Sequence, residues 1–465
     1  MRILHVTLGL PPLRSGGLTS YVLKLIALQK QDPDIGQIAL LYPGRESLLF
    51  SHSHIRSRPR KLEGVSCYEL TNPAPIGLLG GIKEPLRDID HPEAARAYAG
   101  LLRELEPDVV HIHSFIGFGP YLVTLAQQMG IRVIYTAHDY YPICPTVNLM
   151  NAQSLRCDED HGCDDCLACN RHAPSVFERA LRDNPAFYPV RRSKRFKSLA
   201  AALARRLFSS SPSGGGRAEA TPEDYALRRE RLIAAISACN VTTFASHAVL
   251  EVYRRYGFEG QYALFPLIPE GVEKLTPRKG ALPGYPVRIA FIGRATIEKG
   301  PELLIRALSR LEKKGYDFRL KLLGTGAKVD LRDISPSRVT LLPSFTRGEL
   351  NTLLDDVDLV VVPSVWFETF GFVALEGYLK NIPLVLSDSV GFADYIEPEV
   401  TGWLFSSGDA HALREVLAKL LDEPEKLAQA NYAIAQSDKE RFTAKAHYKR
   451  MKQCYQPVTH AGQDA

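Results

Sequence analysis

Two acidic residues flank a glycine in the segment ETFGFVALE, which runs from Glu368 to Glu376. The segment follows an apolar run that ends in DLVVVPSVWF, so it has the pattern of a strand end, a turn and a helix start. If the helix begins near Gly371, Glu376 falls within its first two turns while Glu368 stays on the preceding loop. We therefore expect both carboxylates to face one cleft and to contact one long ligand.

A second set of candidate groups is cationic. The loop GRATIEKG at 293–300 follows the strand-like run VRIAFIG and precedes a helix that starts at Pro301, a favourable first helical position. Backbone amides of such a loop and the positive end of the helix dipole can face an anion. Because Arg294 and Lys299 add fixed positive charge, this pattern predicts a phosphate site.

Four motifs occur along the chain in a set order. They are GLPPLRSGGLTSYV near the start, HDYYPICP at 138–145, FIGRATIEKG at 291–300, and PSVWFETFGFVALEGYLKNIPLVLSDSVGFADYI. Together they resemble the retaining nucleotide-sugar glycosyltransferases of family 4, which have the two-Rossmann-domain fold known as GT-B. The resemblance touches roughly residues 1–145 and 225–455. It departs from the family pattern at Asn381, where the family tends to have glycine, and at a cysteine-rich insertion.

The resemblance implies roles for matching residues. Arg294 and Lys299 would contact the donor's phosphates and offset the charge on the leaving diphosphate. Glu376 would accept hydrogen bonds from ribose hydroxyls, Glu368 would lie by the donor sugar, and His138 would contact the transferred sugar. The candidate catalytic residues are therefore Arg294, Lys299, Glu368 and His138. The candidate donor-binding residues are Gly16, Gly17, Gly293, Gly324, Gly371, Phe372, Glu376 and Gly391, several of them expected to offer backbone amides.

The reaction implied by the resemblance moves a sugar from a nucleotide-diphosphate sugar to an acceptor hydroxyl with retention of configuration. The acceptor would be a saccharide or a lipid-linked saccharide in cell-surface polysaccharide synthesis. No cofactor is expected for the chemistry, because cationic side chains neutralise the phosphates. A nucleotide-sugar epimerase of the same fold and a redox or metal protein centred on the cysteines are the alternatives.

The order of apolar and amphipathic segments predicts an α/β protein with two Rossmann-like domains facing across a cleft. Strand-like runs alternate with helix-like runs in both halves, which is typical of doubly wound parallel sheets. The predicted first domain spans 1–265, with a Cys-rich and helical insertion at about 140–235. Residues 266–286, with five prolines and three glycines, form the predicted linker. The second domain spans 287–440, and 441–465 form a helix and tail that pack back on the first domain.

Five of the eight cysteines lie in the insertion, and three of them have the spacing C-x2-C-x2-C. In a chain expected to stay in the cytoplasm, such clustering favours metal or redox chemistry over disulfides. Four of the five would form a structural zinc site; an iron–sulfur cluster uses the same ligands, and free thiols are the third alternative. The five candidate metal ligands are Cys144, Cys157, Cys163, Cys166 and Cys169. His111 and His113 alternate along a strand, so we expect them to point to opposite faces and to form no shared metal site.

Seven Arg and Lys residues and no acidic residue lie between 187 and 208, beside leucines at intervals of four. Such a helix can lie on an anionic membrane surface, or it can simply be solvated. We expect a cytoplasmic protein, peripheral at the inner membrane face if this segment binds lipid. The net charge of +5 is too small to indicate nucleic-acid binding.

Overall fold

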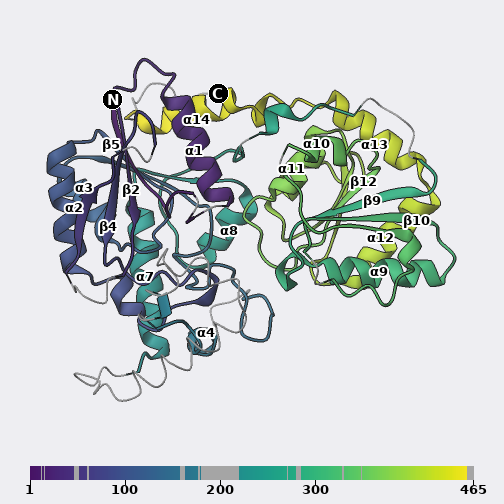
Figure 1. Ribbon diagram of the computed structural model, residues 1–465, viewed down its shortest axis with the longest axis horizontal. Helices are drawn as coiled ribbons and strands as arrows, with labels where there is room; N and C mark the ends of the chain where they lie inside the picture. Colours follow the sequence, from purple (N-terminus) through teal and green to yellow (C-terminus); the bar gives the residue numbers. More distant parts are fainter. Residues whose placement is uncertain are drawn as a thin grey trace.

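The protein has two α/β domains, which lie side by side in Figure 1, the first in purple to teal and the second in green to yellow. A computed structural model describes residues 1–11, 13–14, 16–46, 52–59, 62–157, 163–175, 178–179, 219–269, 271–278, 284–326, 329–346 and 348–457. Both sheets are built of parallel strands apart from one edge strand, so the predicted pair of Rossmann-like domains is confirmed.

The first domain contains an eight-stranded sheet in the order β3-β4-β2-β1-β5-β6-β7-β8. Its strands are β1 (Arg2–Val6), β2 (Gln37–Pro43), β3 (His54–Ser57), β4 (Ser66–Thr71), β5 (Val109–Ile112), β6 (Arg132–Thr136), β7 (Val241–Phe244) and β8 (Tyr262–Leu264). Only β3 is antiparallel to its neighbour among these strands. Chain order reverses between β1 and β5, and at such a reversal parallel sheets bind ligands beyond the carboxyl ends of the strands.

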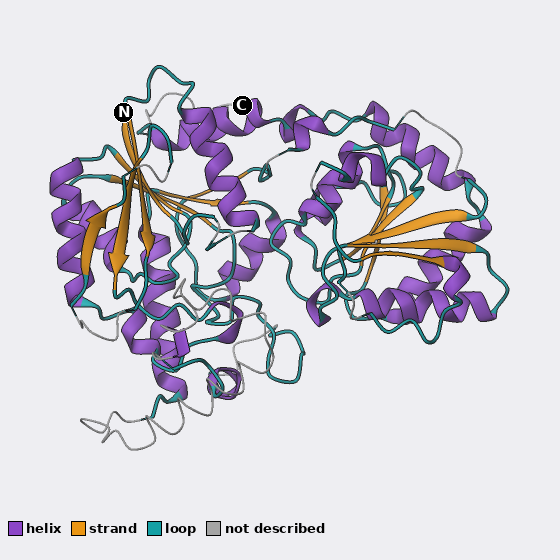
Figure 2. Ribbon diagram, in the orientation of Figure 1, coloured by secondary structure: helices purple, strands orange, loops and turns teal. Residues whose placement is uncertain are grey.

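Helices cover this sheet on both faces (Figure 2). The described ones are α1 (Gly17–Gln29), α2 (Pro92–Leu105), α3 (Tyr121–Gln128), α4 (Asp164–Asn170), α7 (Pro222–Ala238) and α8 (His247–Arg255). Helix α7 begins with a capping box, in which Thr221 and Asp224 each satisfy the other's backbone amide. Its Arg228 is fully buried and forms an ion pair with Asp88 at 2.7 Å, while Tyr141 donates to the same carboxylate. This buried contact anchors the HDYYPICP segment beside the sheet.

The second domain has a six-stranded, fully parallel sheet in the order β11-β10-β9-β12-β13-β14. Its strands are β9 (Val287–Ile292), β10 (Phe318–Leu323), β11 (Val339–Leu342), β12 (Leu359–Val362), β13 (Leu384–Ser387) and β14 (Gly402–Phe405). In Figure 1, α10 (Leu350–Leu353), α11 (Phe372–Leu379) and α13 (Glu425–Gln436) lie on one side of it, and α9 (Pro301–Lys313) and α12 (Ala410–Asp422) on the other. Strand β12, LVVV, is buried along its length, as a strand covered on both faces must be.

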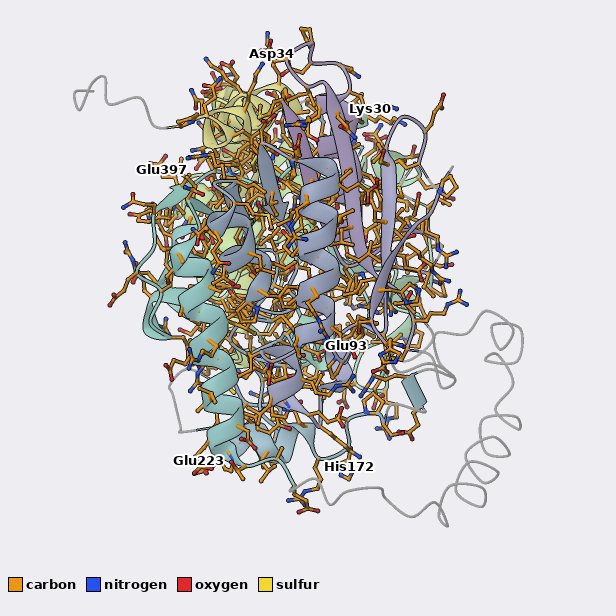
Figure 3. The ribbon with its side chains drawn as sticks, turned by 90° about the vertical axis from the view of Figure 1, so that its left-hand side faces the viewer. Lys30, Asp34, Glu93, His172, Glu223 and Glu397 are labelled. Carbon is orange, nitrogen blue, oxygen red and sulfur yellow. The ribbon has the colours of Figure 1, made fainter. Side chains whose placement is uncertain are left out.

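The last helix, α14 (Ala444–Tyr455), returns from the second domain to the first (Figure 1). Lys452 forms an ion pair with Asp34 at 2.6 Å, and Tyr448 donates to Asp32 at 2.7 Å. Arg132, at the start of β6, donates to the Cys454 carbonyl at 2.8 Å. In Figure 3 the labelled Asp34 lies at the same end of the domain as this yellow helix. The C-terminal segment is thus joined to the domain that begins the chain.

The domains also touch at the turn between β12 and α11. Thr369 Oγ1 donates to the backbone carbonyl of His138 at 3.1 Å, and the Tyr395 hydroxyl donates to the Ala245 carbonyl at 2.5 Å. A Cβ on Gly391 would lie 2.4 Å from the Thr369 carbonyl oxygen and 2.8 Å from Ser246 Oγ of the first domain. The missing side chain at residue 391 therefore permits the close approach.

We predict that Gly391→Ala will destabilise the interdomain contact, because backbone at Thr369 must move to admit the methyl group. Overpacking of this kind typically lowers the free energy of unfolding by about 1–3 kcal/mol. Chemical unfolding would measure this loss, and small-angle scattering would report domain separation. Gly100→Ala is the matched control, since Gly100 lies in α2 and an added methyl group there would have no atom within 4 Å. Equal stability of the two variants would contradict the prediction.

Candidate active site

The site begins with an ion pair between two of the predicted catalytic residues. Lys299 Nζ lies 2.6 Å from Glu368 Oε1, and the other Glu368 oxygen accepts from Ser364 Oγ at 2.6 Å. Lys299 also lies over the ring of Trp366, 5.3 Å from its centroid. The Lys299–Glu368 ion pair therefore connects the loop before α9 to the loop after β12.

The Glu368 carboxylate is mostly buried yet remains ionised. Burial alone would raise its pKa, but the Lys299 charge and the hydrogen bonds from Lys299 and Ser364 hold the pKa below the ordinary value of 4.5. Tyr140, in the HDYYPICP segment, has a pKa raised by burial and then by the charge of Glu368. The charge of Glu368 in the second domain thus affects the pKa of Tyr140 in the first domain.

His138 lies two residues beyond the carboxyl end of β6 and is half-buried. Its backbone carbonyl accepts the hydrogen bond from Thr369, the residue that follows Glu368. The structure therefore brings the predicted sugar-contacting histidine next to the turn that carries the first acid of the pair.

The amino end of α11 supplies backbone donors. Gly371 caps the helix with φ 92° and ψ 65°, a left-handed conformation that favours glycine. Within the described part of the chain, the amides of Gly371, Phe372 and Val373 have no acceptor. Free amides and the helix dipole favour an anion at this end of the helix. Glu376 lies in the second turn of the same helix and is mostly buried.

The predicted glycines of the first domain lie close to this helix. Gly16 is the N-cap of α1, and Gly17 is its first residue. A Cβ on Gly17 would lie 2.9 Å from Cε2 of Phe372, so α1 and α11 begin against each other across the interface.

Arg294 lies in the same loop as Lys299 but outside the ion pair. It follows Gly293 beyond the end of β9, is exposed, and makes no side-chain hydrogen bond or ion pair with the residues that the structure describes. Gly324, at the end of the adjacent β10, has φ 78°, and a Cβ there would lie 3.0 Å from Phe345. These residues share a sheet edge with Lys299, but in the described part of the chain no hydrogen bond or salt bridge joins them to the ion pair.

Some of the backbone amides expected to face an anion are used within the protein. In the GRATIEKG loop, the Lys299 amide donates to the Thr296 carbonyl and the Gly300 amide donates to the Ile297 carbonyl, within a short 3-10 turn. Those two amides are not available to an anion, and for the rest of the loop anion binding stays a prediction. Gly391 likewise donates its amide to the Glu368 carbonyl at 2.9 Å and has none to offer a ligand.

A hollow of about 230 Å³ lies beside the same loop. Its lining includes Thr296, Pro301 and Arg306 of the second domain and Ser154 of the insertion. The insertion therefore reaches the loop that carries Lys299.

Sequence reasoning did not single out several residues that shape the site. Ser364 and Trp366 hold the ion pair, Thr369 joins the domains, and Tyr140 lies near Glu368. All four lie within motifs already recognised, at positions between the charged residues. The polar groups of these four side chains could have marked them as candidates in the sequence. Which residues they contact is seen only in the fold.

The expectation for His111 and His113 is also wrong. Residues two apart in a strand share a face, because side chains alternate with a period of two. Their rings lie 3.9 Å apart, and His5 of the adjacent strand joins them. The three residues place ligand-type nitrogens within 4.8 Å of one another, yet each ring nitrogen already has a hydrogen-bond partner within the protein.

None of the five predicted metal-binding cysteines forms a disulfide with another described residue. Cys163 caps α4, and Cys166 and Cys169 lie on it. A hydrogen bond to Cys163 and then burial raise the pKa of Cys166, and Cys144 raises the pKa of both Cys166 and Cys169, so these four approach one another. Among the described residues, however, the histidines alone bring three ligand atoms within 4.8 Å. The zinc site stays a prediction.

The basic segment at 187–208 lies outside the described residues. Across the part of the chain that the structure covers, no helix combines the length and the apolar character needed to cross a bilayer.

Comparison with known proteins agrees with this architecture. The model "Glycosyltransferase Family 4" matches residues 56–210, and the model "Glycosyl transferases group 1" matches residues 273–437. The chain belongs to this family of GT-B glycosyltransferases.

Curated relatives match over part of their length. The protein named "Putative colanic acid biosynthesis glycosyltransferase WcaL" of Escherichia coli (strain K12) is 29% identical over 156 residues, which cover 31% of this chain and 38% of that protein. The amylovoran biosynthesis glycosyltransferase AmsK of Erwinia amylovora is 30% identical over 150 residues, which cover 29% and 36%. The matched segments thus span less than half of either relative.

Solved structures match over nearly the whole chain. HepE of Anabaena in complex with UDP has a TM-score of 0.59 at 14% identity and covers 97% of this chain and 99% of its own. The lipopolysaccharide outer core galactosyltransferase WaaB has a TM-score of 0.56 at 14% identity, with 97% and 100% covered. At this identity the likeness shows the fold.

We predict that acid will destabilise the protein from about pH 6.5 downward. Burial lowers the pKa of His5 and His447 to about 4 and of His138 to about 3, and the pKa values of His111 and His113 also lie well below 6.5. These rings stay neutral in the folded protein, whereas the unfolded chain binds protons below pH 6.5. The free energy of unfolding should therefore fall between pH 6.5 and about 4, by up to about 1.4 kcal/mol per pH unit for each ring.

Urea unfolding at pH 7.5 and 5.5 would measure this loss. His447→Gln should reduce the pH dependence, since one buried imidazole is removed, while His411→Gln, at an exposed position in α12, should leave it unchanged. An unfolding free energy that is equal at the two pH values would rule out neutral buried rings.

We also predict about one zinc ion per chain after anaerobic purification. The four approaching thiols would lose their protons to the metal, since zinc binds thiolate. Elemental analysis would measure zinc and iron together, with a Cys166→Ser, Cys169→Ser variant as the comparison and Cys239→Ser, a buried cysteine outside the insertion, as the control. Absence of both metals from the wild-type protein would exclude the zinc and iron–sulfur alternatives.

Proposed function

We propose that the protein is a retaining glycosyltransferase that moves a sugar from a nucleotide-diphosphate sugar to an acceptor hydroxyl. The observation that carries the proposal is the Lys299–Glu368 ion pair beside the free amides of α11, because one cation and several N–H donors then serve one anion. HepE, which has the same fold, is known in complexes with UDP and with UDP-glucose, and this supports a donor of that class.

In this proposal the diphosphate competes with Glu368 for Lys299. The ion pair is partly exposed at Lys299, so a phosphate can approach Nζ while Glu368 keeps the side chain extended toward the interface. The solvated Arg294 is free to move onto the same phosphates. Charge that develops on the leaving diphosphate then meets positive groups and amides that are already in place, which is electrostatic stabilisation of the transition state.

The remaining residues position the two ends of the donor. Glu376 would accept hydrogen bonds from the ribose, with the glycines at the start of α1 and α11 allowing close approach of the backbone. His138 and Glu368 would flank the sugar. The bond between the anomeric carbon and the phosphate oxygen breaks, a bond to the acceptor oxygen forms on the same face, and the acceptor proton passes to the leaving phosphate. The proposed chemistry requires no cofactor.

For the acceptor we propose a growing saccharide or a lipid-linked saccharide in cell-surface polysaccharide synthesis. The support is that WcaL and AmsK are named for colanic acid and amylovoran biosynthesis. If residues 187–208 bind anionic lipid, they would bring the protein to such an acceptor at the membrane.

We predict that Lys299→Ala will reduce kcat about 100- to 1,000-fold, the usual effect of deleting one group that stabilises transition-state charge. A panel of nucleotide sugars tested by thermal shift would first identify the donor, since a ligand of the folded state raises the melting temperature. Sugar transfer and donor hydrolysis would then be measured with that donor.

Lys419→Ala is the matched control, because Lys419 lies in the same domain and forms an exposed ion pair with Glu399 at 3.0 Å. It should keep wild-type turnover. Undiminished turnover of Lys299→Ala would exclude the role assigned to Lys299. A donor that binds but yields only an epimerised sugar nucleotide would favour the alternative enzyme class.

A further inference from the structure

A line of hydrogen-bonded rings runs from the domain interface into the first domain. His138 Nε2 lies 3.3 Å from His113 Nδ1, and His113 Nε2 lies 3.0 Å from His5 Nδ1. His5 Nε2 lies 2.8 Å from the Gln29 side-chain oxygen, Oε1. We call His138, His113, His5 and Gln29 the histidine line.

With the Gln29 side-chain oxygen toward His5, the far end of the line sets where each proton sits. The Gln29 oxygen can only accept, so His5 carries its proton on Nε2 and leaves a lone pair on Nδ1. A neutral ring has one N–H, so His113 must donate from Nε2 to His5 and accept at Nδ1. His138 in turn donates from Nε2 and leaves Nδ1 unprotonated.

That last nitrogen is the one available at the interface. Within the described residues His138 Nδ1 has no hydrogen-bond partner, and the residue is half-buried. This nitrogen is a hydrogen-bond acceptor close to the turn that carries Glu368, because Thr369 of that turn donates a hydrogen bond to the His138 carbonyl.

The last helix of the chain orients the amide that starts the line. Gln29 Nε2 donates to the Tyr455 hydroxyl at 3.0 Å, and that hydroxyl is 2.9 Å from His111 Nδ1. His111 Nε2 lies 2.8 Å from Thr136 Oγ1, which closes this branch within the sheet. Rotating the Gln29 amide by half a turn would reverse every donor and acceptor in the line at once.

We propose that Gln29 and Tyr455 are positioning residues that set the tautomer of His138, so that its Nδ1 accepts a hydrogen bond from a hydroxyl of the bound sugar. The proposal rests on the proposed function for the identity of the hydroxyl. It assigns to α14 a chemical task in addition to holding the domains together. The tautomers of the three rings are coupled, because the position of the proton on each ring determines its position on the next.

Nitrogen-15 NMR of histidine-labelled protein at pH 7.5 tests the tautomer without any need for catalysis. A His138→Asn variant assigns the His138 signals by their disappearance. We expect an unprotonated Nδ1 and a protonated Nε2 at His138, His113 and His5 alike. A His138 ring protonated on Nδ1, or on both nitrogens, would overturn the proposal.

Two tyrosines of α14 provide a matched pair of variants. Tyr455→Phe removes the hydroxyl that orients Gln29, whereas Tyr448→Phe removes a hydroxyl that anchors the same helix to Asp32. Tyr455→Phe should shift the His5, His113 and His138 signals together and lower kcat/KM about two- to tenfold, the loss expected for one weakened hydrogen bond. Tyr448→Phe should leave both the three rings and kcat/KM close to the wild type.

Equal losses of kcat/KM in the two variants, or unchanged ring signals in Tyr455→Phe, would refute the positioning role. Helix α14 would then only hold the domains together. If Tyr455→Phe fails to fold, Gln29→Met breaks the line from the other side and is read by the same spectra. The wild-type protein could show the expected tautomer but transfer no sugar from any nucleotide sugar. That result would contradict the proposed function but not the tautomers assigned to the histidine line.

Discussion

The approach of the 368–372 turn to the first domain is the contact on which the rest of the site depends. It places a carboxylate, a free helix end and the His138 carbonyl within one small region, although these groups come from sheets built by different halves of the chain. Glycines at 17 and 391 permit it, since a methyl group at either of them would lie less than 3.0 Å from an atom of the other domain. The chemistry and the domain interface therefore share the same residues.

The charges of Lys299 and Glu368 neutralise each other, which avoids an unpaired buried carboxylate. In the proposed function, an incoming diphosphate would share the positive charge of Lys299. Polar groups behind the interface follow a different rule: the buried histidines remain neutral and satisfy one another, because isolated charges there would be costly to desolvate.

The strands and the motif order were predictable because their signals are local. Continuous apolar runs such as LVVV indicated buried parallel strands, and Pro301 and Gly371 marked helix starts correctly. The amides of Lys299 and Gly300 were misjudged because a loop can satisfy its own donors, and sequence does not show that. His111 and His113 were misjudged by an error in strand periodicity rather than by a lack of signal.

The sequence by itself determined two doubly wound sheets and the types of charge near each turn, since these follow from periodicity, turn residues and local charge spacing. Tertiary structure alone decided which of these groups meet. Lys299 selects Glu368 across 69 residues, and Gln29 meets Tyr455 across 426, because strand order and the return of α14 bring distant segments together. Partners so remote in sequence are chosen by packing, which no local pattern encodes.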